Sequence, residues 1–185
     1  MLWILSSVTN IRMSSQGERS SGFAPLAREN ARVLILGSLP SQRSITDNQY
    51  YAHPQNAFWR IMAELVGASG SYGDRRVALQ KEGIALWDVL ASSVRPGSLD
   101  ADIRVSTAEV NDFERFFAEH DAIERICFNG QTAAKIFSDR VPQDVVDSRV
   151  QLITLPSTSP AHAAMHFDEK LEQWRIGLAP VVKGN

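Results

Sequence analysis

Four short apolar segments recur along the chain. They lie at residues 32–36, 83–87, 125–128 and 150–155, and each is nearly continuous in hydrophobicity. A run of this length without alternating polar residues is typical of a strand that is covered on both faces. The pattern therefore predicts four buried strands.

The stretches between these segments space their apolar residues differently. At residues 57–66 and 107–120, hydrophobic side chains recur every three or four positions, as on one face of a helix. We predict two further helices at residues 132–137 and 169–178. Because strands and helices alternate, the predicted fold class is α/β, a three-layer α/β/α arrangement with a central, mostly parallel four-stranded sheet.

The N-terminal segment, residues 1–23, has neither pattern. It is rich in Ser, Asn, Gln and Gly, which predicts a disordered or poorly ordered extension. The remaining residues, 24–182, suffice for one full hydrophobic core, and a second independent core is not expected in a chain of this length. We therefore predict a single α/β domain over residues 24–182.

Composition excludes several classes of protein. The hydrophobic and charged fractions are 44% and 22%, and no apolar run approaches the roughly 20 residues that span a bilayer. The single cysteine, Cys127, cannot form an internal disulfide, and the first residues lack the basic leader of a signal peptide. We expect a cytoplasmic protein with no membrane contact. The net charge of −2 offers no global attraction for nucleic acid.

Polar loops follow all four predicted strands. They comprise residues 37–44, Asp88 with residues 95–98, Asn129 with Gly130, and residues 156–162. Ligands of open α/β sheets bind beyond the carboxyl ends of the strands. We therefore expect these four loops to meet at one edge of the sheet and to form a site there.

The segment after the first strand loop is the most informative part of the chain. It places Tyr50, Tyr51, His53 and Asn56 before a predicted helix. Because buried polar groups need hydrogen-bond partners, so many of them at one strand end indicate a pocket. An alternative is that the aromatic residues of this segment simply pack in the core. The glycine spacing that cradles a nucleotide phosphate does not occur here, so a nucleotide cofactor is unsupported.

The loop after the fourth strand is stiffened by two prolines and presents Ser157, Ser159 and His162. His162 and His166 are four positions apart, as two metal ligands on a helix are, but no third ligand stands at a suitable spacing. Asn129, at the end of the third strand, has two interpretations. It could cap the following helix, or its paired donor and acceptor could read the edge of a base.

Two charged residues complete the predicted edge. Asp88 follows the second strand as a possible acid or base, and Arg95 could meet a phosphate. By themselves these residues decide nothing about function.

In combination, these motifs resemble the uracil-DNA glycosylase superfamily, particularly its mismatch-specific uracil glycosylases and its hypoxanthine (deoxyinosine) DNA glycosylases. The resemblance covers roughly residues 31–180. It is carried by Gly-Ser-Leu-Pro-Ser at 37–41 and His-Pro-Gln-Asn-Ala-Phe-Trp at 53–59, with weaker support from Trp-Asp-Val at 87–89 and Gly-Ser-Leu-Asp at 97–100.

The sequence departs from the common family pattern at two positions. Leu39 stands where most of the superfamily has a catalytic Asn or Asp, and Leu155 stands where a His or Asn commonly opens the second motif. The hypoxanthine-specific branch is similar to this chain in both motifs. That likeness implies that Asn56 is the catalytic residue.

The resemblance implies a DNA repair glycosylase that hydrolyses the N-glycosidic bond of a flipped-out deaminated base, hypoxanthine first and uracil second. Asn56 would hold the attacking water, and Tyr51 would stack on the base. Backbone N–H groups around Ser38 and Leu39 would stabilise the departing base, with Asn129 as a reader of its edge. Neither a cofactor nor a metal is called for.

The resemblance also implies contacts with DNA, in a damaged or mismatched duplex or in a single strand. Ser41, Ser44, Ser157 and Ser159 would grip the flanking phosphates. His162, with the two residues before it, would press into the space that the flipped nucleotide leaves. We expect the protein to act as a monomer.

Two other classes of function stay open at this point. A serine hydrolase would use Ser38 or Ser157 as nucleophile, His162 as base, and Asp88 or Asp168 to orient the base, although the usual Gly-x-Ser-x-Gly turn does not occur. The second alternative is a catalytically weak or inactive DNA-binding member of the superfamily.

Overall fold

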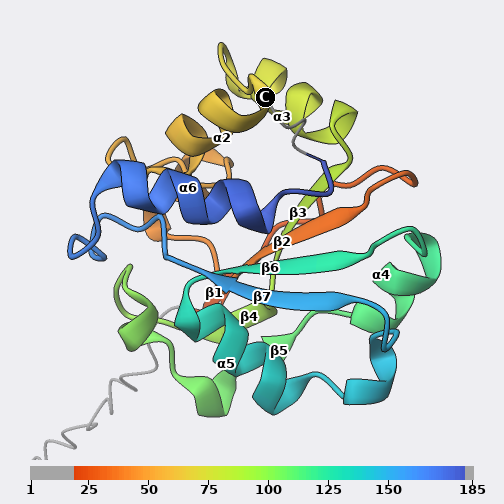
Figure 1. Cartoon of the computed structure of the whole chain (residues 1–185). Helices are drawn as coiled ribbons and strands as arrows, with labels where there is room; N and C mark the ends of the chain where they lie inside the picture. The colour runs from red at the N-terminus through yellow and green to blue at the C-terminus, as the bar shows by residue number, and fades with distance from the viewer. Residues whose placement is uncertain (1–18, 182–185) are drawn as a thin grey trace, which may run out of the picture.

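The computed structural model describes residues 19–181 and contains a central sheet of four parallel strands, whose place among the helices can be followed in Figure 1. The strand order is β3-β2-β6-β7. Their bounds are Val33–Gly37 for β2, Ile84–Asp88 for β3, Arg125–Asn129 for β6 and Gln151–Leu155 for β7. All three neighbouring pairs are parallel, which confirms the predicted sheet and places its four carboxyl ends along one edge.

Alternate side chains of β2 lie on opposite faces of the sheet. Val33 and Ile35 belong to one apolar cluster, and Leu34 and Leu36 belong to the other. This alternation follows from the geometry of a strand, in which successive side chains point to opposite sides. All five residues of β2 are buried, so the strand runs through the centre of the molecule.

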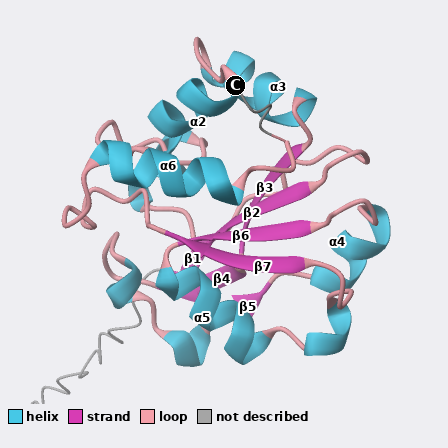
Figure 2. Cartoon of the chain, in the orientation of Figure 1, coloured by secondary structure: helices cyan, strands magenta, loops and turns pink. Residues whose placement is uncertain are grey.

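Helices cover both faces, as Figure 2 shows. On one face lie α2 (Phe58–Val66), α3 (Tyr72–Lys81) and α6 (Phe167–Gly177). On the other lie α4 (Phe113–Glu119) and α5 (Gln131–Arg140).

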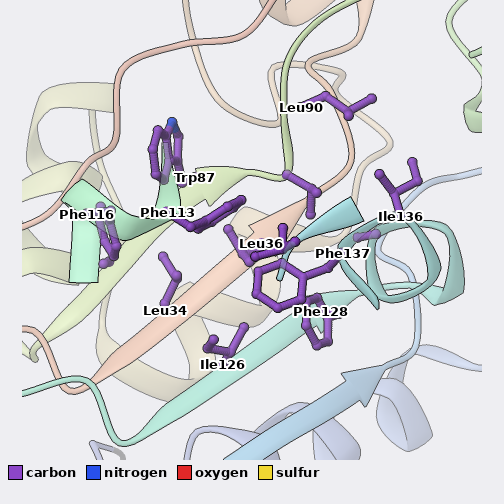
Figure 3. Packing of buried hydrophobic residues seen from close by; sticks show 14 of the residues in the cluster. Leu34, Leu36, Trp87, Leu90, Phe113, Phe116, Ile126, Phe128, Ile136 and Phe137 are labelled. Atoms are coloured by element: carbon purple, nitrogen blue, oxygen red, sulfur yellow. The ribbon is translucent and has the colours of Figure 1, made fainter. Parts of the chain in front are cut away.

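Figure 3 shows how the side chains of this second face pack. The ring of Phe137 on α5 lies against those of Phe113 and Phe128, each with its centroid 5.1 Å away. The three-layer α/β/α prediction is therefore confirmed.

A small second sheet was not predicted. Its order is β1-β4-β5, with β1 at Arg19–Ser21, β4 at Leu90–Val94 and β5 at Glu109–Val110. The predicted disordered extension of residues 1–23 must be corrected for its last part, because β1 pairs antiparallel with β4. Residues 1–18 lie outside the described residues.

Strand β1 is held by polar contacts with other strands, which explains why the apolar pattern of the sequence did not predict it. The Arg19 guanidinium donates to Ser92 Oγ at 2.7 Å and forms an ion pair with Glu109 at 2.6 Å. These partners lie 73 and 90 positions away in the sequence, by subtraction of their numbers. The strand is thus held by residues that its own sequence does not reveal.

Several predicted boundaries also change. The helix expected at residues 107–120 begins only at Phe113, where Asp112 accepts the backbone N–H of Arg115 as an N-cap. Helices α1 (Gln42–Asp47) and α3 were missed. In α3 a single residue, Leu79, is buried, so no apolar stripe marks it, and the Ser71–Asp74 capping box marks its start instead.

The remaining short elements are three 3-10 turns, η1 (Asp100–Asp102), η2 (Val105–Thr107) and η3 (Gln143–Val145). Strand β7 departs from the prediction of strands covered on both faces, because it lies at the edge of the sheet and the Leu152 side chain is exposed. Within residues 19–181, no helix is both long and apolar enough to cross a membrane.

Candidate active site

A cavity of about 230 Å³ lies at the carboxyl ends of the four parallel strands. It is lined by residues of the loops that follow β2 and β7, by Asp88 and Asn129 at the ends of β3 and β6, by residues 98–100 after β4, and by the segment before α2. The site residues predicted from the sequence that line this cavity are Ser38, Leu39, Ser41, Ser44, Tyr51, Asn56, Asn129, Ser157 and Ser159. The predicted meeting of the loops at one edge of the sheet is therefore confirmed.

His162 is the one predicted site residue that lies elsewhere. It lines a neighbouring hollow of about 580 Å³, which shares Ser157 and Ser159 with the cavity. The His162 backbone closes a turn, because its N–H donates to the Ser159 carbonyl at 3.0 Å. The loop thus separates the two hollows and presents His162 on the outer side.

Tyr51 is held in an unusual backbone conformation beside the cavity. Its φ of 52° is in the left-handed region, which residues other than Gly and Asn adopt only rarely. Its ring is stacked on Phe58, with centroids 4.1 Å apart, and the next residue, Ala52, donates its N–H to Ser44 Oγ at 3.2 Å. The sequence-based alternative of aromatic packing is therefore also correct in part, since Phe58 and Trp59 are buried in the core.

The Tyr51 hydroxyl is buried without a hydrogen-bond partner. Burial raises its pKa, and the charge of Asp88 adds to this effect, whereas the nearby Asn129 side chain lowers it. The hydroxyl is therefore neutral and able to donate.

Asn56 lies half-buried at the start of α2. Its Oδ1 accepts the backbone N–H of Phe58 at 2.9 Å, which satisfies one of the unpaired donors at the helix N-terminus. A carbonyl oxygen has two acceptor positions, so one remains for a further donor. The side chain thus has a structural role in addition to any chemical one.

Asn129 is clamped to the opposite loop. Its Nδ2 donates to Thr158 Oγ1 and its Oδ1 accepts the Thr158 N–H, both at 2.8 Å. The interpretation of Asn129 as a helix cap is wrong, because Gly130 occupies the N-cap of α5 with a φ of 98°. The amide keeps one N–H and one acceptor position for a ligand.

Thr158, which sequence analysis missed, completes this clamp. It is fully buried, and its carbonyl accepts the Ala57 N–H at 3.0 Å, so it joins the end of β6 to the start of α2. Sequence alone does not distinguish it from Ser157 and Ser159 on either side.

The serine hydroxyls of the site also have partners within the protein. Ser41 accepts the Ser44 N–H as N-cap of α1, Ser157 accepts the Ser159 N–H, and Ser159 accepts the Ala161 N–H. Ser44 is buried. These bonds shape the loops, and contact of the hydroxyls with phosphate stays a prediction.

Arg95 does not face a phosphate. Its side chain is buried, and its guanidinium donates to the backbone carbonyls of Leu39 and Pro40. The suggestion that Arg95 could meet a phosphate is therefore wrong, because its polar atoms hold the loop after β2 in place.

Asp88 and Asp100 bring negative charge to the cavity. Asp100 accepts a 2.5 Å hydrogen bond from Ser38 Oγ. Burial, with a further contribution from the charge of Asp100 and against the opposing charge of Arg95, raises the pKa of Asp88 to about 7. Asp88 is thus poised to change protonation state near neutral pH.

The geometry does not support a serine hydrolase. Ser38 donates to a carboxylate, Ser157 accepts from the backbone, and His162 does not line the cavity that contains both serines. Among the described residues no serine is hydrogen-bonded to a histidine ring, and no group of three His, Cys, Asp or Glu residues could hold a metal ion.

Comparison with known proteins identifies the relatives of this fold. The family model described as the uracil DNA glycosylase superfamily matches residues 24–178. A protein of Methanosarcina barkeri named hypoxanthine DNA glycosylase is 36% identical over 120 residues, which cover 63% of this chain and 75% of that protein. A protein of Methanosarcina acetivorans with the same name is 38% identical over 117 residues, covering 62% and 73%.

Solved structures agree with this relationship. The solution NMR structure of a candidate uracil DNA glycosylase from Methanosarcina acetivorans superposes with a TM-score of 0.75 at 30% sequence identity. The match covers 89% of this chain and 99% of that one. The chain therefore belongs to the uracil DNA glycosylase superfamily.

Proposed function

We propose that the protein is a DNA glycosylase that hydrolyses the N-glycosidic bond of a deaminated base, hypoxanthine first and uracil second. The observation that carries the proposal is the cavity at the strand ends, which brings Tyr51 and Asn56 of one segment together with Ser157 of a loop far away in the sequence. The two Methanosarcina relatives named hypoxanthine DNA glycosylase support the choice of base.

Base flipping brings the damaged nucleotide to this cavity. A base inside a duplex is unreachable, and its extrusion costs a few kcal/mol, least for a mispaired base. Tyr51 offsets part of this cost by contacting the base with its ring, since stacking contributes about 1–3 kcal/mol per base. The stack of Tyr51 on Phe58 supports this role because it holds the ring in one orientation.

Asn56 positions the attacking water in this proposal. Its Oδ1 accepts the Phe58 N–H and offers its second acceptor position to the water. An amide is a weak base, which suits a proton transfer that follows the development of positive charge on the sugar. The helix bond fixes the amide orientation, so the water is held without further ordering of the side chain.

Stabilisation of the departing base falls to the opposite side of the cavity. The second Nδ2 hydrogen of Asn129 and the backbone N–H groups of Ser38 and Leu39 donate to the base as negative charge develops on it. The clamp between Asn129 and Thr158 supports this assignment, because a donor that is already oriented needs no reorganisation.

The remaining residues contact the DNA around the flipped nucleotide. Ser41, Ser157 and Ser159 bind flanking phosphates. Ser44 supports the loop after β2 through its hydrogen bonds with Ser41 and Ala52. The loop that ends at His162 enters the space left in the duplex. The proposal includes a double-stranded substrate and a single copy of the chain as the acting unit.

One experiment tests the proposed activity. The purified protein is incubated with oligonucleotides that carry hypoxanthine, uracil, xanthine or a thymine mismatch, and abasic sites are then cleaved with alkali. We expect strand scission to be fastest at hypoxanthine. If no damaged base yields scission, the proposal is wrong.

A pair of variants tests the role of Asn56. Asn56→Ala is expected to lower the single-turnover rate on inosine-containing DNA at least about 100-fold. It should also destabilise the protein by about 1 kcal/mol, because the Phe58 N–H at the start of α2 loses its side-chain acceptor. Asn56→Ser is the matched control, since it keeps a capping oxygen and shortens the side chain. An Asn56→Ser variant with the wild-type rate would remove Asn56 from catalysis.

Leu39 favours one alternative function. It is buried in the cavity wall at the position where most of the superfamily has a polar residue, and a leucine cannot orient water. A DNA-binding protein without catalysis would bind inosine-containing duplex and give no abasic product after long incubation. The oligonucleotide assay therefore distinguishes the two functions directly.

A further inference from the structure

Asp88 is a buried carboxyl group that the roles above do not use. It is the last residue of β3, it lines the cavity, and its exposed fraction is 3%. Its Oδ2 is buried and has no hydrogen-bond partner within the protein. A buried polar atom without a partner is unfavourable, so its retention beside a cavity requires an explanation.

The neighbouring strand makes room for this group. A Cβ atom added to Gly37 would lie 2.4 Å from Asp88 Oδ1 and 3.0 Å from the Tyr51 hydroxyl. Gly37 pairs directly with Asp88 in the parallel register of β2 and β3. The carboxyl group and the phenol therefore share the space that a side chain at residue 37 would fill, and both lie in the cavity lining.

The charges around Asp88 do not neutralise it. Arg95, which follows β4, directs its guanidinium at the carbonyls of Leu39 and Pro40 and forms no ion pair with Asp88 within the described residues. Asp100 of η1 adds a like charge. The Tyr51 hydroxyl approaches Asp88 beside Gly37, whereas the more distant Tyr50 hydroxyl donates to the Ala24 carbonyl, and both phenols remain neutral because burial raises their pKa.

We propose that Asp88 is a further catalytic residue, the acid that gives its proton to the departing base. This inference rests on the proposed glycosylase function and assigns that function a substrate class, deaminated purines. The raised pKa of about 7 supports it, since a large fraction of the carboxyl groups then carries a proton at neutral pH.

The proton and electron balance of the step is simple. The bond between C1′ of the sugar and N9 of hypoxanthine breaks, and both electrons stay on the base. The Asp88 proton moves to a ring nitrogen, N3 or N7, so the base leaves neutral and Asp88 becomes a carboxylate. Water bonds to C1′, and the proton it releases returns to Asp88 through solvent after the base has left.

The assignment predicts a preference between bases. Uracil leaves as an anion that is stabilised by two carbonyl groups, so it depends less on a proton donor than a purine does. Asp88 should therefore matter more for hypoxanthine than for uracil, and an acid of this kind typically contributes about 100-fold or more to a rate.

The central experiment compares the wild type with Asp88→Asn in single-turnover cleavage of inosine-containing DNA. Asn matches the shape of a neutral carboxyl group but cannot release a proton. At pH 6, we expect the single-turnover rate of the variant to be about 100-fold below that of the wild type on inosine-containing DNA. On uracil-containing DNA the rate should fall less than about tenfold. The wild-type rate should fall about tenfold per unit above pH 7, and the variant should be flat across that range. Equal rates and equal pH profiles overturn the inference.

Two modified substrates and a control variant extend this experiment. Substrates with 7-deazahypoxanthine or 3-deazahypoxanthine each lack one candidate nitrogen, and on one of them the difference between wild type and variant should disappear. A difference that persists on both overturns the inference. Asp139→Asn, an exposed substitution of the same type on α5, is the matched control and should retain the wild-type rate.

A thermal measurement tests the protonation of Asp88 without any substrate. In the folded protein Asp88 binds a proton up to about pH 7, whereas its ordinary pKa is 3.8. Between these values the folded state binds more protons, so this group makes stability fall as the pH rises. The Tm of the wild type should therefore fall relative to that of Asp88→Asn from pH 5 to 8. If Tm plotted against pH is parallel for the two proteins, the inference is wrong even if the protein cleaves DNA. If the wild type cleaves no damaged base, the glycosylase proposal is wrong as well.

Discussion

Two groups of residues in the cavity, a clamp and a floor, differ in whether their buried polar atoms have hydrogen-bond partners. The clamp consists of Asn129 and Thr158, whose side chains bond to each other. The floor consists of Gly37, Asp88 and the Tyr51 hydroxyl, where Asp88 Oδ2 and the phenol have no partner. Satisfied groups stabilise the shape of a site, whereas buried groups without partners reduce stability and are retained where a ligand can use them. The comparison separates scaffold from chemistry within one cavity.

The largest effect is expected from filling the floor. Gly37→Ala places a methyl group 2.4 Å from Asp88 Oδ1, so the carboxyl group or the strand must move. We expect a loss of about 1–3 kcal/mol in the free energy of unfolding. Glycosylase activity should fall about 100-fold, because a displacement of about 1 Å in a catalytic group has effects of this size.

The control for this substitution is Gly73→Ala in α3. An added Cβ there has one neighbour within 4 Å, Ser71 Oγ at 3.7 Å, which is an ordinary contact. Urea denaturation and the single-turnover assay should detect no loss in the control. If Gly37→Ala behaves like the control, the floor is not closely packed and the comparison fails.

A smaller effect is expected from opening the clamp. Thr158→Val keeps the shape of the side chain and removes Oγ1, which leaves the buried Asn129 amide without its acceptor. The free energy of unfolding should fall by about 1 kcal/mol. Thr154→Val, at an exposed position of β7, should change it by less than about 0.5 kcal/mol. Equal results for the two variants would show that the clamp adds no stability.

The smallest effect on stability is expected at the Tyr51 hydroxyl. Because this group has no partner, Tyr51→Phe should leave the free energy of unfolding unchanged or raise it by up to about 1 kcal/mol. Tyr50→Phe is the matched comparison, since the Tyr50 hydroxyl donates to the Ala24 carbonyl at 3.2 Å and its loss should cost about 1 kcal/mol. A Tyr51→Phe variant that is the less stable of the two would contradict the assignment of the floor.

The sequence predicted the large sheet well because its signal is local. Each strand of the β3-β2-β6-β7 sheet begins and ends within about one residue of the apolar segment that predicted it. Residues such as Val33 to Leu36 are buried on both faces, so hydrophobicity alone marks them. The convergence of the loops followed from parallel topology, which required no knowledge of individual contacts.

The parts that escaped prediction depend on distant partners. Arg95 resembles a phosphate ligand in sequence, and only the fold reveals that the carbonyls of Leu39 and Pro40 occupy its donors. Asn129 fits a helix cap equally well until Thr158, 29 positions later, binds both ends of its amide. Local pattern therefore identified the residues of the site, whereas tertiary contacts decide what each one does.

The bond from the Ala57 N–H to the Thr158 carbonyl has a consequence for folding. It joins the first half of the chain to its last strand loop, 101 positions away by subtraction, and contacts of such long range form slowly because loop closure costs entropy. A ribosome-bound chain that has emerged only as far as β6 can pair β3, β2 and β6 but still lacks this closing bond. During synthesis, the pocket is therefore completed only after the loop that follows β7 has left the ribosome, so chains that stop before this loop are not expected to excise bases.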